Sequence, residues 1–283
     1  MLLLFGVVPQ TLSPPRAFFC GMTERLPVVL LVGGLGTRMG PETDGRPKPL
    51  VEIGGRPILW HIMKVYAAYA HTHFILPLGH RGDLFRRYFV EYEALSHDFT
   101  FALGQPGVRC YHHTNQEQDW QVTLMDAGLA TNKGARVRKA AVHLAGDRFF
   151  VTYGDGIGDV DLAALLAFHR AHGKLATLTG YQPYSQYGVV DADEAGHVLQ
   201  LQEKPRLTSW INAGFFVFER AALEYFAGDD TLDLERQVLP RLTADGQLAM
   251  YRHTGFWASM DTFKEAQELG EIWERGAPWK IWD

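Results

Sequence analysis

The chain has 283 residues, of which 47% are hydrophobic and 21% charged, a composition typical of a globular protein. A net charge of −5 argues against the basic stripe of a dedicated nucleic-acid-binding protein. No apolar run reaches the ~18 residues that a membrane span needs. Two cysteines, Cys20 and Cys110, cannot form a disulfide framework, which favours a reducing compartment. We therefore expect a cytoplasmic protein whose partners include neither nucleic acid nor membrane.

The first 22 residues differ from the remainder of the chain. The apolar run Met1–Val8 has no Lys or Arg before it, unlike a secretory signal, and prolines interrupt the stretch that follows. Met22 is the natural first residue in this interpretation. We expect residues 1–22 to be a disordered leader without function, and residues 23–283 to form one domain that ends in a helical segment.

From Pro27 onward, apolar runs of strand length alternate with stretches of helical spacing. The predicted strands are Val28–Val32, Phe74–Leu78, Phe149–Tyr153, Leu175–Tyr181, Gly188–Asp191, Val198–Gln202 and Ile211–Phe218. The predicted helices are Pro57–Ala70, Asp83–Ala94, Asp161–His172, Asp233–Leu242 and Thr262–Arg275. This alternation predicts an α/β fold with a Rossmann-like, mixed but largely parallel sheet and helices on both faces. Ligands of such sheets bind at the carboxyl ends of the strands.

The loop after the first predicted strand carries the strongest chemical signal. It runs Gly33-Gly34-Leu35-Gly36-Thr37-Arg38 and is followed, after nine residues, by Lys48 between two prolines. Glycines let backbone amides approach an anion closely, while the guanidinium of Arg38 and the ammonium of Lys48 suit phosphate oxygens. Neither the dinucleotide fingerprint nor the P-loop pattern is met. The loop therefore predicts a phosphate site of another kind.

The spacing Gly-x-Gly-Thr-Arg-x9-Lys resembles the signature of the sugar-1-phosphate nucleotidyltransferases, the nucleoside-diphosphosugar pyrophosphorylases. Later motifs of that family follow in order, and the resemblance extends from about Pro27 to the C-terminus. These motifs are Tyr153–Gly156, Gln202–Pro205, Ile211–Gly214 and Trp257–Thr262.

Two further stretches resemble the branch of this family that uses CTP and glucose 1-phosphate. Val51–Met63 fits that branch at every position, and Ala277–Trp282 matches its C-terminal motif. The departures are modest, since Val32 replaces a usual Ala and Ala127 stands where a Thr is common. The resemblance implies CTP and glucose 1-phosphate as partners, with UTP or dTTP and other hexose 1-phosphates as alternatives.

The implied reaction joins a sugar 1-phosphate to the α-phosphate of a nucleoside triphosphate and releases pyrophosphate. The nucleophile is a phosphate oxygen that is already anionic, so the reaction needs charge stabilisation rather than a general base. Cationic side chains, backbone amides and Mg²⁺ suit that task, and Mg²⁺ is the expected cofactor.

The resemblance also assigns roles to individual residues. Arg38 and Lys48 match catalytic cations, while Asp155 and Asp261 match the aspartates that hold Mg²⁺. The implied nucleotide-binding residues are Leu31, Gly33, Gly34, Gly36, Thr37, Arg38, Lys48, Thr123, Gly128, Arg136 and Asp155. The implied sugar-phosphate-binding residues are Gly188, Glu203, Lys204 and Asn212.

Structural and functional alternatives to these roles stay open. Asp155 also suits a turn, Asp261 a helix N-cap, and Val122–Leu124 a plain strand. A glycosyltransferase would need an Asp-x-Asp motif after the middle strand, where this chain has Gly154-Asp155-Gly156. A regulatory subunit without catalysis would tolerate loss of the catalytic residues, which are all present. We also expect a homo-oligomer, because tryptophans near the C-terminus suit a subunit interface.

Overall fold

A computed structural model describes residues 24–34, 45–104, 107, 109–112 and 116–282. The predicted leader and three predicted site residues, Gly36, Thr37 and Arg38, lie outside the described residues. Within the described residues, no helix is long and apolar enough to cross a membrane.

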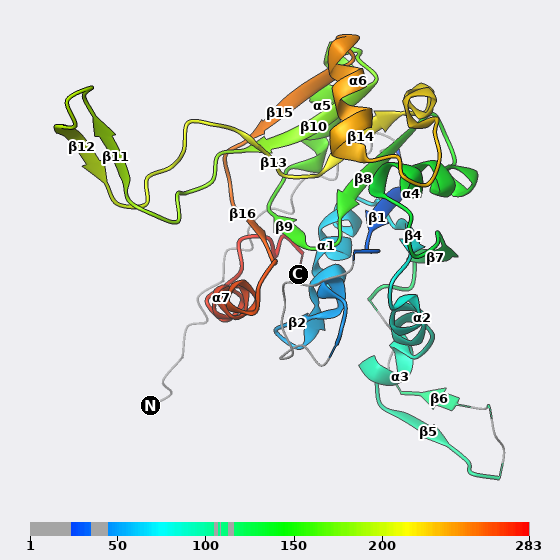
Figure 1. Cartoon of the computed structure of the whole chain (residues 1–283). Coiled ribbons are helices and arrows are strands. Elements are labelled where there is room, and N and C mark those ends of the chain that lie inside the picture. The colour runs from blue at the N-terminus through cyan, green and yellow to red at the C-terminus, as the bar shows by residue number, and fades with distance from the viewer. Residues whose placement is uncertain (1–23, 35–44, 105–106, 108, 113–115, 283) are drawn as a thin grey trace, which may run out of the picture.

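The domain is organised around one eight-stranded sheet, in which β1 lies between β4 and β8 (Figure 1). Strands β1, β4, β7 and β8 are mutually parallel, whereas β14 joins β8 and β10 in antiparallel fashion, and β15 runs parallel to β10. The sheet strands are β1 (Val28–Leu31), β4 (His73–Leu78), β7 (Gln121–Asp126), β8 (Arg148–Tyr153), β10 (Ala176–Tyr181), β13 (Ile211–Asn212), β14 (Phe216–Glu219) and β15 (Leu248–His253). The predicted mixed, largely parallel sheet is confirmed.

Helices cover both faces of this sheet. The helices are α1 (Ile58–Ala67), α2 (Gly82–Val90), α3 (Tyr92–Ser96), α4 (Lys133–Ala140), α5 (Leu162–His172), α6 (Leu239–Ala244) and α7 (Phe263–Glu274). Because side chains alternate along β1, Val28 and Leu30 enter a core with α1, α5 and α7, whereas Val29 and Leu31 enter a second core with α4 and α6. Strands of this kind are apolar on both sides, which is why Val28–Val32 reads as an uninterrupted apolar run.

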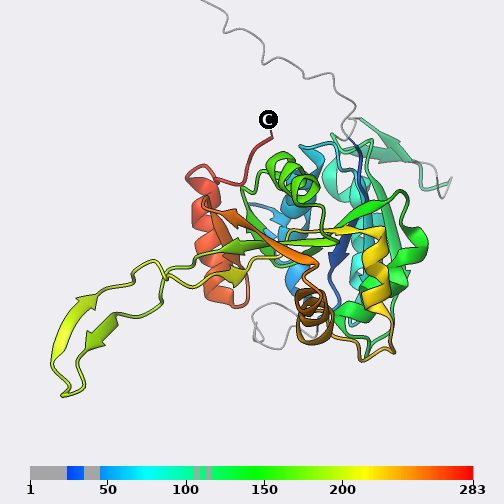
Figure 2. The same cartoon turned by 90° about the horizontal axis from the view of Figure 1, so that it is seen from above.

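Smaller elements complete the chain. The short strands are β2 (Glu52–Ile53), β3 (Arg56–Pro57), β5 (Phe99–Phe101), β6 (Arg109–Tyr111), β9 (Gly156–Gly158), β11 (Val189–Ala192), β12 (Val198–Gln202) and β16 (Trp257–Ser259). The 3-10 turns are η2 (Lys48–Leu50), η3 (Ala141–His143) and η4 (Arg220–Phe226), and η5 (Leu234–Val238) is a π-helical turn. Strands β11 and β12 form a hairpin that projects away from the sheet in both views (Figures 1 and 2).

Three predicted elements are interrupted in the structure. The predicted helix Asp83–Ala94 divides into α2 and α3 at Glu91, where φ −95° and ψ 5° leave the helical region. The predicted strand Ile211–Phe218 divides into β13 and β14 along one edge of β10, because Gly214 and Phe215 adopt positive φ. The predicted helix Asp233–Leu242 begins as the π-helical turn η5 and continues as α6.

Candidate active site

A cavity of about 820 Å³ opens at the carboxyl ends of the parallel strands. Its polar lining brings together eight residues that the sequence predicted from distant positions. These are Leu31, Gly33, Gly34, Lys48, Arg136, Asp155, Asn212 and Asp261. The place is the one that the strand order of an α/β sheet predicts for a ligand.

The ends of β1 and β8 place Lys48 beside the cavity. Gly154 follows β8 and donates its backbone N–H to the carbonyl of Leu31 over 3.1 Å. A Cβ on Gly154 would lie 2.9 Å from Val32 Cγ1 and 3.0 Å from Pro49 Cγ, so only glycine fits between β1 and the η2 turn. This close packing fixes the η2 turn, and with it Lys48, against the end of β8 that Asp155 follows.

A short strand pair brings the two predicted metal ligands together, although 106 positions separate them in the chain. Strands β9 and β16 pair with Gly156 opposite Ser259, and Met260 donates its N–H to the carbonyl of Asp155 over 2.8 Å. Asp155 and Asp261 therefore flank the same pair of strands. The N-cap of α7 is Thr262, in a capping box with Glu265, so the alternative of an Asp261 N-cap is wrong.

Charge is concentrated around these carboxylates. The ammonium of Lys48 forms an ion pair with Asp261. Burial raises the pKa of the Asp155 carboxyl, and the charge of Asp261 raises it further, while Lys48 and Lys133 oppose the shift. A buried carboxyl with a second carboxylate beside it is a site that a cation would stabilise.

Arg136 is held beneath the glycine loop rather than exposed to it. Only 3% of its surface is accessible, and its guanidinium donates to the carbonyls of Pro77, Leu78 and Gly128 over 2.9–3.1 Å. A Cβ on Gly33 would lie 2.3 Å from Arg136 Nη1. Arg136 thus ties the end of β4 to the loop after β7, and Gly33 must be glycine for the loop to lie over it.

A series of hydrogen-bonded polar side chains also lines the cavity. Asn212 Nδ2 donates to the hydroxyl of Tyr153 over 2.9 Å, and that hydroxyl donates to Glu235 Oε1 over 2.7 Å. Glu235 Oε1 also forms an ion pair with Lys133, whose Nζ lies 5.1 Å from the Tyr153 ring centroid. Burial, followed by the charge of Glu235, raises the pKa of Tyr153, so its proton stays in this series at neutral pH.

Other predicted residues do not line the cavity. Thr123 lies in the middle of β7, opposite Ile75, and Gly128 takes φ +92° in the loop that follows. Gly188, Glu203 and Lys204 are exposed at the base of the β11–β12 hairpin, where a Cβ on Gly188 would lie 3.1 Å from Glu203 Oε2. Their roles stay predictions.

Several polar residues of the cavity were not predicted from the sequence, and three of them, Lys133, Tyr153 and Glu235, interact with one another. Tyr153 lies in the family motif Tyr153–Gly156, but the motif alone does not indicate its contacts. Glu235 lies in the first turn of a predicted helix, a position that points toward the ligand edge of the sheet. Lys133 begins α4, a helix of only eight residues with weak apolar periodicity, which the pattern did not predict.

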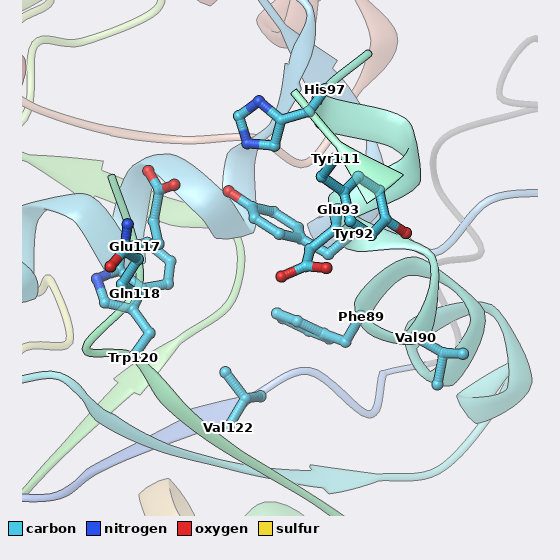
Figure 3. A pocket seen from close by; sticks show the side chains of 10 residues that line it. All are labelled: Phe89, Val90, Tyr92, Glu93, His97, Tyr111, Glu117, Gln118, Trp120 and Val122. Carbon is cyan, nitrogen blue, oxygen red and sulfur yellow. The ribbon is translucent and has the colours of Figure 1, made fainter. Parts of the chain in front are cut away.

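A second cavity of about 700 Å³ lies between α2, α3, β6 and the start of β7 (Figure 3). Phe89, Trp120 and Val122 form its apolar side, while Glu93 and Glu117 contribute carboxylates. None of the described residues lining it is a lysine or arginine. It therefore lacks the positive charge that two phosphorylated substrates require, and the cavity at the strand ends is the candidate active site.

Comparison with known proteins agrees with this geometry. The sequence profile of the family described as Nucleotidyl transferase matches residues 27–269. The chain therefore belongs to the nucleotidyl transferase family, which confirms the resemblance seen in the motifs.

Individual relatives narrow the comparison. The chain is 41% identical over 258 residues to a glucose-1-phosphate cytidylyltransferase of Salmonella typhi, covering 90% of this chain and 99% of that protein. It is 31% identical to a mannose-1-phosphate guanylyltransferase of Mycobacterium tuberculosis, covering 85% of this chain and 62% of that protein. The crystal structure of HddC from Yersinia pseudotuberculosis superposes with a TM-score of 0.65 at 20% identity, covering 88% of this chain and 99% of HddC. This last likeness concerns the fold.

Proposed function

We propose that the protein transfers the cytidylyl group of CTP to glucose 1-phosphate, forming CDP-glucose and pyrophosphate. The observation that carries the proposal is the meeting of Lys48, Asp155 and Asp261 in one cavity at the carboxyl ends of β1 and β8. The 41% identity to a named glucose-1-phosphate cytidylyltransferase over nearly the full length of both chains supports the choice of substrates.

The chemistry follows from charge. An oxygen of the sugar phosphate attacks the α-phosphate of CTP, a new P–O bond forms, and the bond to the β-phosphate breaks. Lys48 would stabilise the negative charge that two phosphates bring together, and the amides of Gly33 and Gly34 would contact the triphosphate. We assign no general base, because the attacking oxygen carries no proton that must leave.

We infer that Mg²⁺ is the cofactor and that Asp155 and Asp261 hold it. Mg²⁺ binds through one or two carboxylates together with substrate oxygens, and the charge of Asp261 beside the buried Asp155 carboxyl fits a cation between them. The metal supplies positive charge at the phosphate oxygens of both substrates.

We further propose that the protein acts in the cytoplasm as a homo-oligomer. The β11–β12 hairpin supports the second point, because both of its strands are exposed throughout and a two-stranded hairpin is marginal alone. It carries Val190, Leu199 and Leu201 with 55–68% of their surface accessible. A second copy of the chain would bury this apolar surface.

Pyrophosphate release tests the activity directly. Purified protein with Mg²⁺ is assayed with CTP, UTP, dTTP and GTP against glucose, mannose and galactose 1-phosphates. We expect the largest kcat/KM for CTP with glucose 1-phosphate. A higher value for UTP or dTTP would move the protein to the alternative predicted from the sequence, and CTP binding without turnover would favour a regulatory subunit.

A further inference from the structure

The cavity contains a cation that the family motifs do not account for. Lys133 is the first residue of α4 and lines the cavity together with Lys48 and Asp155. About 44% of the Lys133 side chain is accessible, so a substrate can reach it.

The start of α4 is held rigidly, and this fixes the origin of the Lys133 side chain. Asn132 donates its N–H to the carbonyl of Asp230 over 2.8 Å and its side-chain amide to the carbonyl of Thr231 over 2.8 Å. A Cβ on Gly134 would lie 2.9 Å from the carbonyl oxygen of Leu232, so the helix packs directly on backbone. A lysine on such a support is aimed with less loss of entropy than one on a free loop.

Glu235, the partner of Lys133, connects it to Asn212, a predicted sugar-binding residue. Glu235 Oε1 accepts from both Lys133 and the Tyr153 hydroxyl, and that hydroxyl accepts from Asn212 Nδ2. Asn212 Oδ1 in turn accepts from the N–H of Gly214 over 3.0 Å, which fixes the orientation of the amide. The Tyr153 hydroxyl is used as donor and acceptor, so Tyr153 positions its neighbours rather than the substrate.

We propose that Lys133 binds the phosphate of the sugar 1-phosphate, and that Glu235 and Tyr153 position it at a fixed separation from Asn212. The amide of Asn212 would contact a sugar hydroxyl while the ammonium of Lys133 contacts the phosphate of the same molecule. In this arrangement Gly33, Gly34 and Lys48, which line the same cavity, would contact the triphosphate. This inference rests on the proposed function, and it adds a phosphate-binding residue to the site.

The variants Lys133→Gln, Arg138→Gln and Tyr153→Phe test the proposal through separate KM values for the two substrates. Lys133→Gln removes the charge at similar size, and we expect the KM for glucose 1-phosphate to rise roughly tenfold to a hundredfold. The KM for CTP stays within about twofold, because this cation does not serve the triphosphate. Tyr153→Phe removes the hydroxyl that links Asn212 to Glu235, and we expect it to raise the KM for glucose 1-phosphate roughly threefold to tenfold.

Arg138→Gln is the matched control, because Arg138 lies on the same helix and pairs with Asp230 outside the cavity. Its KM values should equal those of the wild type. An unchanged KM for glucose 1-phosphate in Lys133→Gln, or a rise confined to CTP, would overturn the proposal. Thermal melting of each variant shows whether a change in KM accompanies a loss of folded protein.

A binding measurement keeps this inference separate from the proposed function. Isothermal titration of the wild type with glucose 1-phosphate and with glucose measures the preference for the phosphate without any turnover. We expect Lys133→Gln to lose roughly tenfold or more of that preference. If the assay with nucleotides fails but this preference depends on Lys133, the proposed reaction is wrong and the phosphate site stands. A preference that survives in Lys133→Gln overturns the inference itself.

Discussion

Predicted site residues lie in two very different surroundings. One group forms the floor of the cavity, by which we mean Gly33, Lys48, Arg136 and the turn Gly154-Asp155, and the other lies at the base of the β11–β12 hairpin. The floor lies between two hydrophobic cores. Gly33 and Gly154 pack there too closely for a Cβ, and Arg136 is held by three backbone carbonyls. The hairpin that bears Gly188, Glu203 and Lys204 is exposed along both strands. The comparison teaches that predicted site residues in a packed cavity are held by their neighbours, whereas those at the base of the hairpin have no such packing among the described residues.

The largest expected effect belongs to the floor. Lys48→Ala removes a positioned charge that pairs with Asp261, and we expect turnover to fall on the order of a hundredfold, about 3 kcal/mol of barrier. Steady-state kcat for pyrophosphate release measures the effect, with near-UV circular dichroism as the check on folding. Activity within twofold of the wild type would remove Lys48 from the catalytic machinery.

The next largest effect is the dependence of folding stability on pH, which two buried histidines of the core introduce. Burial lowers the pKa of His61 and of His71 from 6.5 to about 4. His71 Nδ1 accepts from the N–H of Leu26 over 3.1 Å, so the neutral ring is the folded form. Above pH 6.5 neither state binds the proton and stability is full, whereas between pH 6.5 and 4 the unfolded chain gains protons and stability falls.

At about pH 5 the loss is roughly 2 kcal/mol for each histidine. Urea unfolding of the wild type and of His71→Gln at about pH 7.5 and 5 measures it. The variant should lose less stability between the two pH values than the wild type does. Equal losses in both proteins would show that His71 is not the group that titrates.

A single methyl group tests the packing of the glycine loop. Gly33→Ala would place a Cβ against the buried guanidinium of Arg136, and we expect roughly 1 to 3 kcal/mol of destabilisation. Gly34→Ala is the control, because no atom of the described residues lies within 4 Å of a Cβ there. Urea unfolding of both variants measures the difference. Equal urea midpoints for Gly33→Ala and Gly34→Ala would mean that Arg136 moves aside without loss of stability.

The hairpin should contribute least to folding and most to assembly. Val190 pairs with Leu201, and Leu199 lies two positions away on the same strand, so the triple change to serine removes one apolar face. We expect light scattering to show the mass falling to that of one 31.8 kDa chain, with the circular dichroism of the body unchanged. A monomeric wild type would contradict the proposed homo-oligomer.

The same comparison explains what could be predicted from the sequence. Val28–Val32 and Phe149–Tyr153 are largely apolar runs, because strands buried on both faces leave little choice of residue. Once these strands are recognised, the positions of the loops after them can be predicted as well. Lys48 and Asp155 were therefore placed correctly at one edge of the sheet. The contacts of Arg136 were not predictable, since they depend on three carbonyls that converge only in the folded chain. Lys133 and Glu235 lie 102 positions apart, and no local pattern marks their pairing.

The central claim is that the carboxylates at the ends of β8 and β16 and the lysine beside them form a metal-assisted phosphate-transfer site. The most direct test is the rate of CDP-glucose formation across a Mg²⁺ titration for the wild type, Asp155→Asn and Asp261→Asn. We predict that each variant needs more Mg²⁺ and has a lower kcat, since Asp155 and Asp261 would hold the ion whose charge stabilises the phosphates during transfer. A Mg²⁺ dependence that is unchanged in both variants would contradict this account.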